Sequence, residues 1–352
     1  MTKQITVLVF FTSILYCQNW LKTRPSSNYL IEDKEIHLSN LKQLTFEGEN
    51  AEAYFNKEGD KLIFQSHTGD SLCDQIYIMN LKTGLVDLVS TGNGATTCSF
   101  FEYPECKKII YSSTHLDNLK CPQKPDYSMG YVWKLYEGYD IFSADISGKN
   151  LKRLTDAKGY DAEATFAFDG SKIIYTSLKS GDLDLWIMLP DGSGKRQLTD
   201  RLGYDGGAFF SLDGESIVWR AYYPETKTQI ANYLDLLSSN SIRPMALQIW
   251  TMDVDGSNKR QVTKNKAANF GPFFFPNSKR IIFSSNLHDS SGRDFDLYAI
   301  DKDGSNLERI TFFKGFDGFP MFSTNGKYLV FASNRNQKKK GETNLFVCEW
   351  VD

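Results

Sequence analysis

The stretch DGSKIIYTSLKSGDLDLWIMLPDGSGKRQLTD, residues 169–200, decides the fold because its three elements recur along the chain. A turn with a β-branched run comes first (DGSKIIY), a second apolar run follows (DLWIML), and a Leu-Thr pair closes the unit. The turn-plus-run element begins at six positions: Glu58, Glu105, Asp169, Asp213, Asn277 and Asn325. Most neighbouring copies lie about 44 to 48 residues apart, which is the period of four-stranded propeller blades.

The other two elements recur once in each repeat, after the first. The second run starts at Gln75, Asp140, Asp184, Gln248, Asp296 and Asn344. The Leu-Thr pair or a relative of it lies at 44–45, 154–155, 198–199, 262–263 and 310–311, with Leu88-Val89 as the variant. If strands A to D run outward from the axis, these elements are strands B, C and D. We therefore predict an all-β protein, a six-bladed β-propeller with four-stranded blades.

The phase of the repeat predicts how the ring closes. The last repeat supplies strands A, B and C but no D strand after Glu349. One D-type element remains at the other end of the sequence, from Ile36 to Thr45. An N-terminal strand that completes the last blade would remove an unpaired sheet edge. We expect one propeller domain over residues 36–352, because each blade buries its faces only against its neighbours.

The first residues have the pattern of a secretion signal. Lys3 precedes an apolar stretch from Ile5 to Tyr16 that is too short to span a bilayer. We predict a signal peptide at 1–18, a tether at 19–35, and no transmembrane segment in the mature chain. The location is then periplasmic or extracellular; a lipid anchor at Cys17 is the alternative, although Tyr16 is bulky for that signal.

Export would permit disulfides. Five cysteines remain beyond Cys17: Cys73, Cys98, Cys106, Cys121 and Cys348. Cys98 falls at the start of strand A in blade two and Cys121 in the loop between strands B and C of that blade. Loops of both kinds emerge on one face of a propeller, so we predict a Cys98–Cys121 bridge. Five free thiols are the alternative, since spacing alone does not determine connectivity.

Two blades carry insertions between strands B and C. They cover about 115–138 and 222–246, and the second contains a helical pattern from Glu225 to Leu237. The first is rich in aromatic residues, of which Tyr131, Trp133 and Tyr136 are the best candidates for contact with a partner. Long loops on a compact scaffold are usually functional. The insertions would form two walls of a cleft or, alternatively, a cap over the channel.

The loops between blades place polar residues on the same face. Asp161, Asp205 and Asp317 each follow an aromatic residue, and Glu163 lies near the first. Strands B end there with side chains that include Arg220 and Arg335. One interpretation is a polar pocket for a ligand or partner. The other is that each aspartate caps its own loop. The sequence leaves both open.

The motifs for chemistry are weak. There is no G-x-S-x-G, HExxH or P-loop pattern. His67, His115 and His288 occupy comparable positions and could in principle bind a transition metal, but they belong to blades one, two and five. We therefore expect no cofactor. Net charge is −3 with mixed signs, which indicates no nucleic-acid partner, and we expect a monomer.

The repeat resembles a known family. Its "LT" strand, its "DGxxIxF" turn and strand, and its "DLYxxDxDGSN" hairpin are similar to the WD40-like repeats of TolB-type six-bladed propellers, over residues 36–352. TTC at Thr96 and CP at Cys121 are similar to a subgroup of secreted bacterial TolB-like proteins, and that resemblance implies the Cys98–Cys121 pairing. TolB itself has an additional N-terminal α/β domain, for which the roughly twenty residues before the propeller leave no space.

Two functions follow as hypotheses. The first is a non-enzymatic binding platform in the bacterial cell envelope, which holds an envelope protein or peptide on the face with the insertions. The second is an enzyme with a site in the axial pocket, such as a metal-dependent polysaccharide lyase with His67, His115 and His288 as ligands. The absence of catalytic motifs favours the first.

Overall fold

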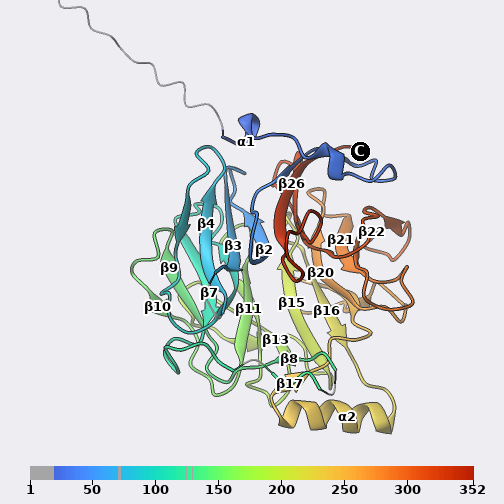
Figure 1. The fold of residues 1–352 in the computed structure, drawn as a ribbon. Coiled ribbons are helices and arrows are strands. Elements are labelled where there is room, and N and C mark those ends of the chain that lie inside the picture. The colour runs from blue at the N-terminus through green and yellow to red at the C-terminus, as the bar shows by residue number, and fades with distance from the viewer. Residues whose placement is uncertain (1–19, 70–72, 124, 129) are drawn as a thin grey trace, which may run out of the picture.

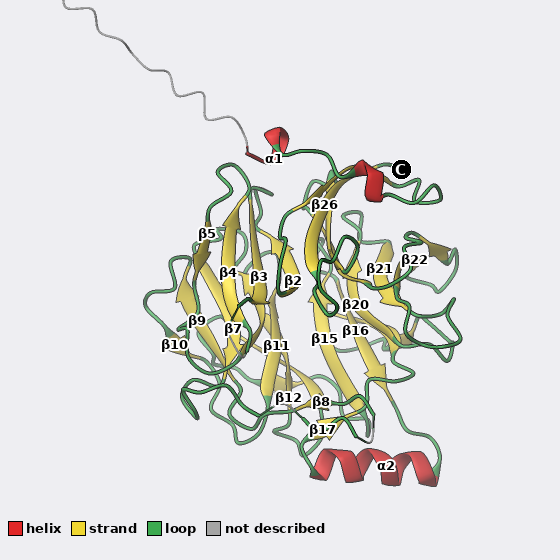
Figure 2. Cartoon of the chain, in the orientation of Figure 1, coloured by secondary structure: helices red, strands yellow, loops and turns green. Residues whose placement is uncertain are grey.

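The computed structural model describes residues 20–69, 73–123, 125–128 and 130–352. The proposed signal peptide and Cys17 lie outside these residues. Within them, six antiparallel four-stranded sheets form the blades of a propeller, so the predicted fold is confirmed. Strands dominate the molecule, and α2 is the long helix at one end (Figure 2).

The first three blades follow one another in the chain (Figure 1). Blade one contains β2 (Glu49–Phe55), β3 (Lys61–His67), β4 (Gln75–Asn80) and β5 (Val86–Leu88). Blade two contains β6 (Thr96–Phe101), β7 (Lys108–Ser113), β9 (Asp140–Asp145) and β10 (Lys152–Arg153). Blade three contains β11 (Asp161–Phe166), β12 (Ile173–Ser177), β13 (Asp184–Met188) and β14 (Arg196–Gln197).

The other three blades repeat this order. Blade four contains β15 (Tyr204–Phe210), β16 (Ser216–Tyr222), β18 (Gln248–Asp253) and β19 (Arg260–Gln261). Blade five contains β20 (Asn269–Phe274), β21 (Arg280–Ser285), β22 (Asp296–Asp301) and β23 (Glu308–Arg309). Blade six contains β24 (Asp317–Phe322), β25 (Tyr328–Ser333), β26 (Asn344–Trp350) and, from the other end of the chain, β1 (Leu38–Gln43).

The N-terminal strand closes the ring as predicted. β1 pairs antiparallel with β26, with Leu38 opposite Trp350 and Gln43 opposite Phe346. Residues 20–35, with α1 (Trp20–Thr23) and η1 (Asn28–Leu30), lie against the propeller rather than away from it. The ammonium group of Lys42, in β1, donates to the carbonyls of Leu21, Lys22 and Arg24. This segment therefore packs on the closing strand.

The Leu-Thr marker has a structural reason. In blade three, Thr199 Oγ1 accepts from Leu185 N at 2.8 Å and donates to Asp184 at 3.3 Å, which joins strands C and D at their polar ends. In blade one the same position is Ser90, whose Oγ accepts from Ile76 N at 3.0 Å. The marker in blade one is therefore the pair Val89-Ser90, not the predicted pair Leu88-Val89. A hydroxyl group at this point satisfies a backbone N–H that would otherwise be buried without a partner.

The innermost strands all contain a bulge that faces the axis. In each one the pairing with strand B shifts register. The residue with left-handed backbone at the bulge is one of Glu52, Cys98, Glu163, Gly207, Gly271 and Phe319. All six line one small cavity, so they surround the axis as a ring. The sixfold repeat therefore directs one position of every blade to a shared centre.

Aromatic side chains fill the axis next to this ring. Tyr54 of blade one and Phe209 of blade four belong to opposite blades, yet their ring centroids are 5.4 Å apart. Phe100 and Phe273 complete the cluster, 6.0 and 5.3 Å from Phe209. Below the ring of six residues, the axis is therefore a packed core. Space for a ligand on the axis lies on the other side of that ring.

The two insertions join over that side. β8 (Trp133–Lys134) from the first pairs with β17 (Ser241–Ile242) from the second. The predicted helix is confirmed as α2 (Lys227–Ser238), with Thr226 and Gln229 forming a capping box at its N-terminus. In Figure 1 the insertions and α2 lie at the end of the molecule opposite α1. We call this end the insertion face.

Candidate functional site

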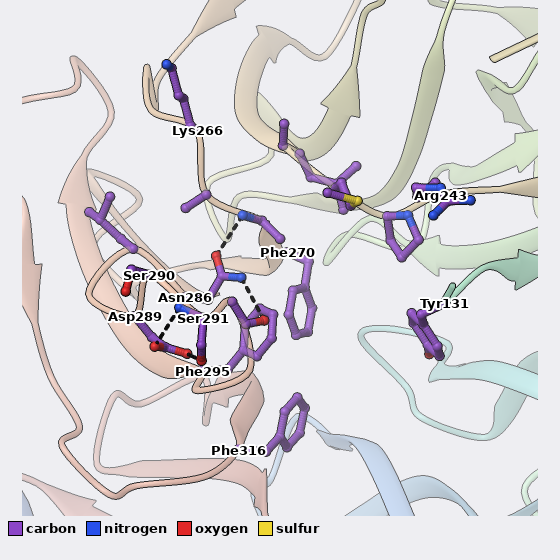
Figure 3. Close-up of a pocket in the computed structure, with 18 of the residues that line it drawn as sticks. Tyr131, Arg243, Lys266, Phe270, Asn286, Asp289, Ser290, Ser291, Phe295 and Phe316 are labelled. Atoms are coloured by element: carbon purple, nitrogen blue, oxygen red, sulfur yellow. Dashed lines mark hydrogen bonds between the residues drawn. The ribbon is translucent and has the colours of Figure 1, made fainter. Parts of the chain in front are cut away.

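The insertion face contains two cavities. The larger, about 890 Å³, lies between residues 243–247 of the second insertion and the loops of blades five and six; we call it the outer cavity (Figure 3). The smaller, about 370 Å³, lies between the first insertion and the ring of residues around the axis; we call it the axial pocket. Tyr131 and Trp133 line both cavities, because the first insertion separates them.

The outer cavity has an aromatic floor. Phe270 lies at its centre, with ring centroids of Phe295 and Phe319 at 5.3 and 5.4 Å and that of Phe316 at 6.2 Å. Phe270 lies in β20 of blade five and Phe319 in β24 of blade six, whereas Phe295 and Phe316 directly precede β22 and β24 and form a bridge with each other. Figure 3 shows Tyr131 across the cavity from Asp289 and Ser291, with the phenylalanine rings between. The cavity is therefore suited to an apolar group.

The polar wall of the outer cavity is internally satisfied. Asp289 accepts hydrogen bonds from Ser291 Oγ and from the backbone N–H groups of Ser291, Arg293 and Asp294. These bonds hold the pKa of Asp289 well below its ordinary value. The opposite rim carries Arg243, and Lys266 is exposed at the edge. The cavity wall therefore contains an ionised carboxylate that already has four donors, and its edge carries the exposed cation Lys266.

The axial pocket contains a buried ion pair. Arg220 binds the Glu163 carboxylate, which also accepts from Thr176 Oγ1 at 2.8 Å and from Gly207 N at 2.9 Å. The Arg220 guanidinium lies over the rings of Trp133 and Tyr204, at 5.0 and 5.6 Å from their centroids. Burial lowers the pKa of Arg220, but the Glu163 carboxylate outweighs that effect and the net shift is upward. Arg220 therefore stays charged.

A second carboxylate in this pocket is Glu52. Enclosure by the protein raises its pKa to about 7, and the negative charges of Glu163 and Asp74 act in the same direction. The Cys98 side chain and Arg220 oppose the rise without cancelling it. Glu52 therefore titrates near neutral pH. The carboxylate of Asp74, the other nearby acid, lies 2.6 Å from His67 Nδ1.

The predicted polar residues divide into two groups. Glu163 and Arg220 line the axial pocket, as described above. Asp161, Asp205, Asp317 and Arg335 are instead buried within the blades. Arg335 bridges Asp317 at 2.7 Å and Glu35 at 3.1 Å. Asp205 accepts from Trp219 and Tyr223. The geometry of these four is that of structural supports.

The predicted aromatic residues also differ in their surroundings. Tyr131 is 63% exposed, and its ring stacks on that of Tyr127 at 5.7 Å. Trp133 covers Arg220 and meets Tyr204 edge-on at 6.1 Å, so it supports the pocket wall. The hydroxyl of Tyr136 donates to Gln123 O at 2.9 Å. Tyr131 is the most accessible of the three predicted contacts.

The three histidines have separate partners. His67 pairs with Asp74, His115 Nδ1 lies 2.9 Å from Ser113 Oγ, and His288 Nε2 lies 3.2 Å from Asp296. In the part of the chain that the structure describes, no group of three or more His, Cys, Asp or Glu side chains could hold a metal ion. The hypothesis of a three-histidine metal centre therefore has no support from this geometry.

The predicted disulfide was wrong. Cys121 bonds to Cys73, and Cys98 is a free thiol that lies at the bulge of β6 and faces the axial pocket. Cys73 belongs to the B–C loop of blade one, and Cys121 to the B–C insertion of blade two. These loops emerge on one face from adjacent blades, so they meet there, whereas the bulge turns Cys98 toward the axis. The bond ties the first insertion to blade one.

Sequence reasoning missed Glu52 and the phenylalanine floor. Glu52 lies in an ENAEAYF segment without any catalytic motif, and only the equivalence of the six bulges reveals where it lies. Phe270, Phe295, Phe316 and Phe319 each have the pattern of core residues. A signal was present in the repeat alignment, because Glu52, Cys98 and Glu163 occupy the same place in successive blades.

Solved structures with this fold are numerous, although no protein-family model matches the sequence. TolB from Acinetobacter baumannii is 16% identical, with a TM-score of 0.56 over 76% of this chain and 55% of that chain. A putative TolB from Agrobacterium tumefaciens is also 16% identical, with a TM-score of 0.57 over 87% of this chain and 91% of that chain. The fold is the TolB-like propeller.

The TolB-like propeller also occurs in an enzyme. An oligogalacturonate lyase in complex with manganese is 15% identical, with a TM-score of 0.51 over 89% of this chain and 93% of that chain. This chain spans about half the length of the Acinetobacter TolB. At such identities the likeness concerns the fold alone, so function has to be argued from the site.

Within the described residues, the structure contains no helix long and apolar enough to span a membrane.

Proposed function

We propose that this protein is a non-enzymatic binding platform of the bacterial cell envelope, and that it captures a protein partner through the outer cavity. The observation that carries the proposal is the cavity itself: about 890 Å³, floored by four phenylalanines and walled by an insertion that β8–β17 pairing holds in place. A cavity of this size and polarity is typical of ligand sites. The TolB-like fold supports a binding role, and the disulfide supports export, since such bonds persist in oxidising compartments.

The rim of the cavity favours a protein over a small metabolite. Tyr131, Met245 and Leu287 are 63%, 61% and 39% exposed, which gives the mouth an apolar border. Apolar borders around a preformed pocket are typical of interfaces in which one anchor side chain enters and its neighbours pack around it. The exposed cation Lys266 favours a partner whose anchor is followed by an acidic residue.

The test is capture with purified components. The mature chain is used to isolate a partner from envelope extract, and the affinity of the purified pair is then measured. Y131A/M245A removes two rim side chains, and we expect at least a ~10-fold loss of affinity. The matched control is L85A/L88A, which removes two exposed side chains from the outer edge of blade one. Equal affinity for wild type and Y131A/M245A, at equal thermal stability, would refute the assignment.

The alternative is an enzyme with its site in the axial pocket. Glu52 favours it, because a carboxyl with a pKa of about 7 suits proton transfer at neutral pH. Turnover of uronate polymers by the wild type and its loss in E52Q would support this function. Failure of wild type to act on these polymers, with or without added divalent metal, would leave the binding platform.

A further inference from the structure

Among the residues that the structure describes, the axial pocket contains an acidic group, Glu52, that forms no ion pair. Among the described residues, the other two acids of the pocket are paired: Glu163 with Arg220, and Asp74 with His67. Gln65 Nε2 also donates to Asp74, at 3.1 Å. No ion pair to Glu52 occurs in the part of the chain that the structure covers. The negative charge of Glu163 is neutralised by Arg220. The acidic group that could attract a charged ligand is therefore Glu52.

The pocket already holds one cation with the groups that recognise cations. Arg220 lies between the Glu163 carboxylate and the faces of Trp133 and Tyr204. Aromatic faces attract organic cations, and the attraction grows when the site excludes water. Beside Glu52 the wall continues with aromatic rings, contributed by Tyr127, Tyr131, Tyr136 and Tyr139. The same combination of a carboxylate and rings is therefore present a second time, and no cation among the described residues pairs with it.

One nitrogen of Arg220 also lacks a hydrogen-bond partner among the described residues. Arg220 is 7% exposed and lines the pocket, and its Nε has no hydrogen-bond acceptor among the described residues. Because this nitrogen has almost no accessible surface, its missing acceptor is a cost to the fold rather than a contact for a ligand. The volume of about 370 Å³ is sufficient for a small organic molecule.

We propose that the axial pocket binds an organic cation, an alkylammonium or guanidinium group, whose charge lies at Glu52 among the tyrosine rings. The occupant is a free small molecule or a lysine or arginine side chain of a partner, which share this chemistry. The axial pocket is a different site from the outer cavity. A negative result for one proposal therefore does not contradict the other.

The test compares two molecules of the same shape. Choline and 3,3-dimethylbutan-1-ol differ in one atom, the nitrogen that carries the charge, and both have a hydroxyl group. Titration calorimetry of the mature protein should give choline a Kd of about 1 mM or tighter and at least ~10-fold preference over the alcohol. Nα-acetyl-lysine N-methylamide is a third probe, which mimics a lysine side chain of a protein. Tighter binding of this probe than of choline would indicate a protein side chain as the occupant, and tighter binding of choline would indicate a free metabolite.

The variant E52Q removes the charge but keeps the shape. We expect it to reduce choline affinity at least ~10-fold, while E105Q, at an exposed position in an A–B turn, leaves it unchanged. Equal binding of choline and the alcohol would overturn the proposal. So would undiminished choline binding by a folded E52Q protein, or failure of both cations to bind the wild type.

The pH dependence adds an independent readout. Because cation binding requires ionised Glu52, affinity should fall by up to tenfold per pH unit below about 7. The titratable and charged groups around Glu52 are Cys98, Glu163, Asp74, Arg220, Tyr54 and Tyr139. His67, which pairs with Asp74, is the other group to consider. A pH dependence that persists in E52Q would assign the titration to His67 and contradict the role of Glu52.

Discussion

The carboxyl group of Asp205 shows how a repeated acid supports the fold at the scale of one residue. It is fully buried, and its Oδ1 accepts from Trp219 Nε1 and Tyr223 OH, both at 2.6 Å. Burial raises its pKa to about 7. The folded chain therefore holds this proton at pH values where the unfolded chain has lost it, and the associated stability disappears as pH rises through about 7.

The variant D205N tests this linkage. Asparagine can still accept the two hydrogen bonds but does not titrate, so between pH 4 and pH 7 the wild type should lose stability relative to D205N. Each pKa unit corresponds to about 1.4 kcal/mol, so we expect a relative loss on the order of a few kcal/mol. Urea unfolding at several pH values measures it, with D87N at an exposed position as control. Parallel pH profiles for wild type and D205N would contradict the assignment.

At the scale of elements, the first insertion depends on its attachments. It has little regular structure of its own: β8 is two residues long, and most of the segment is loop. Its position follows from the β8–β17 pairing on one side and the Cys73–Cys121 bond on the other. Both cavities use this segment as a wall, so their shape depends on these two attachments.

Removing the disulfide should therefore affect stability and both cavities. The bond closes a segment with a sequence separation of 48 residues, and we expect C73S/C121S to lower the free energy of unfolding by about 2 to 4 kcal/mol. C98S is the matched control and should have a much smaller effect, since Cys98 is a free thiol. Peptide mapping without reduction checks the connectivity. A fragment that links Cys98 to Cys121 would show the structure to be wrong here.

At the scale of the whole molecule, stability depends on closure of the ring. β1 brings residues from near the start of the sequence to β26 near its end, and Leu41 is fully buried in that strand. Glu35 and Lys42 add polar contacts to blade six and to residues 21–24. Without this strand, blade six would present an unpaired edge at β26.

The variant L41D tests the closure. A charge at this buried position has no partner, so we expect the free energy of unfolding to fall by at least ~3 kcal/mol. The control is L88D, the same substitution in the outer strand of blade one, where Leu88 is 48% exposed. Its effect should be within about 0.5 kcal/mol. Chemical denaturation compares them, and similar midpoints would show that β1 contributes little.

Much of the architecture could be predicted from the sequence. The six turn-plus-run elements, the partner runs and the spare D-type segment at 36–45 determined the number of blades, their strands and the way the ring closes. The helix near 227–238 was also predictable from its spacing. These features depend on local order along the chain, namely turn residues, β-branched runs and their period, and such order is legible in a single sequence.

The site was decided by the tertiary structure. Glu52, Glu163 and Arg220 meet because bulges in blades one and three and a strand B in blade four face one axis. The phenylalanine floor and the Cys73–Cys121 bond likewise join residues that only ring closure brings together. A hydrophobic or acidic residue has the same local pattern whether it lines a core or a cavity. Which one it lines depends on the residues opposite, and these come from blades distant in the sequence.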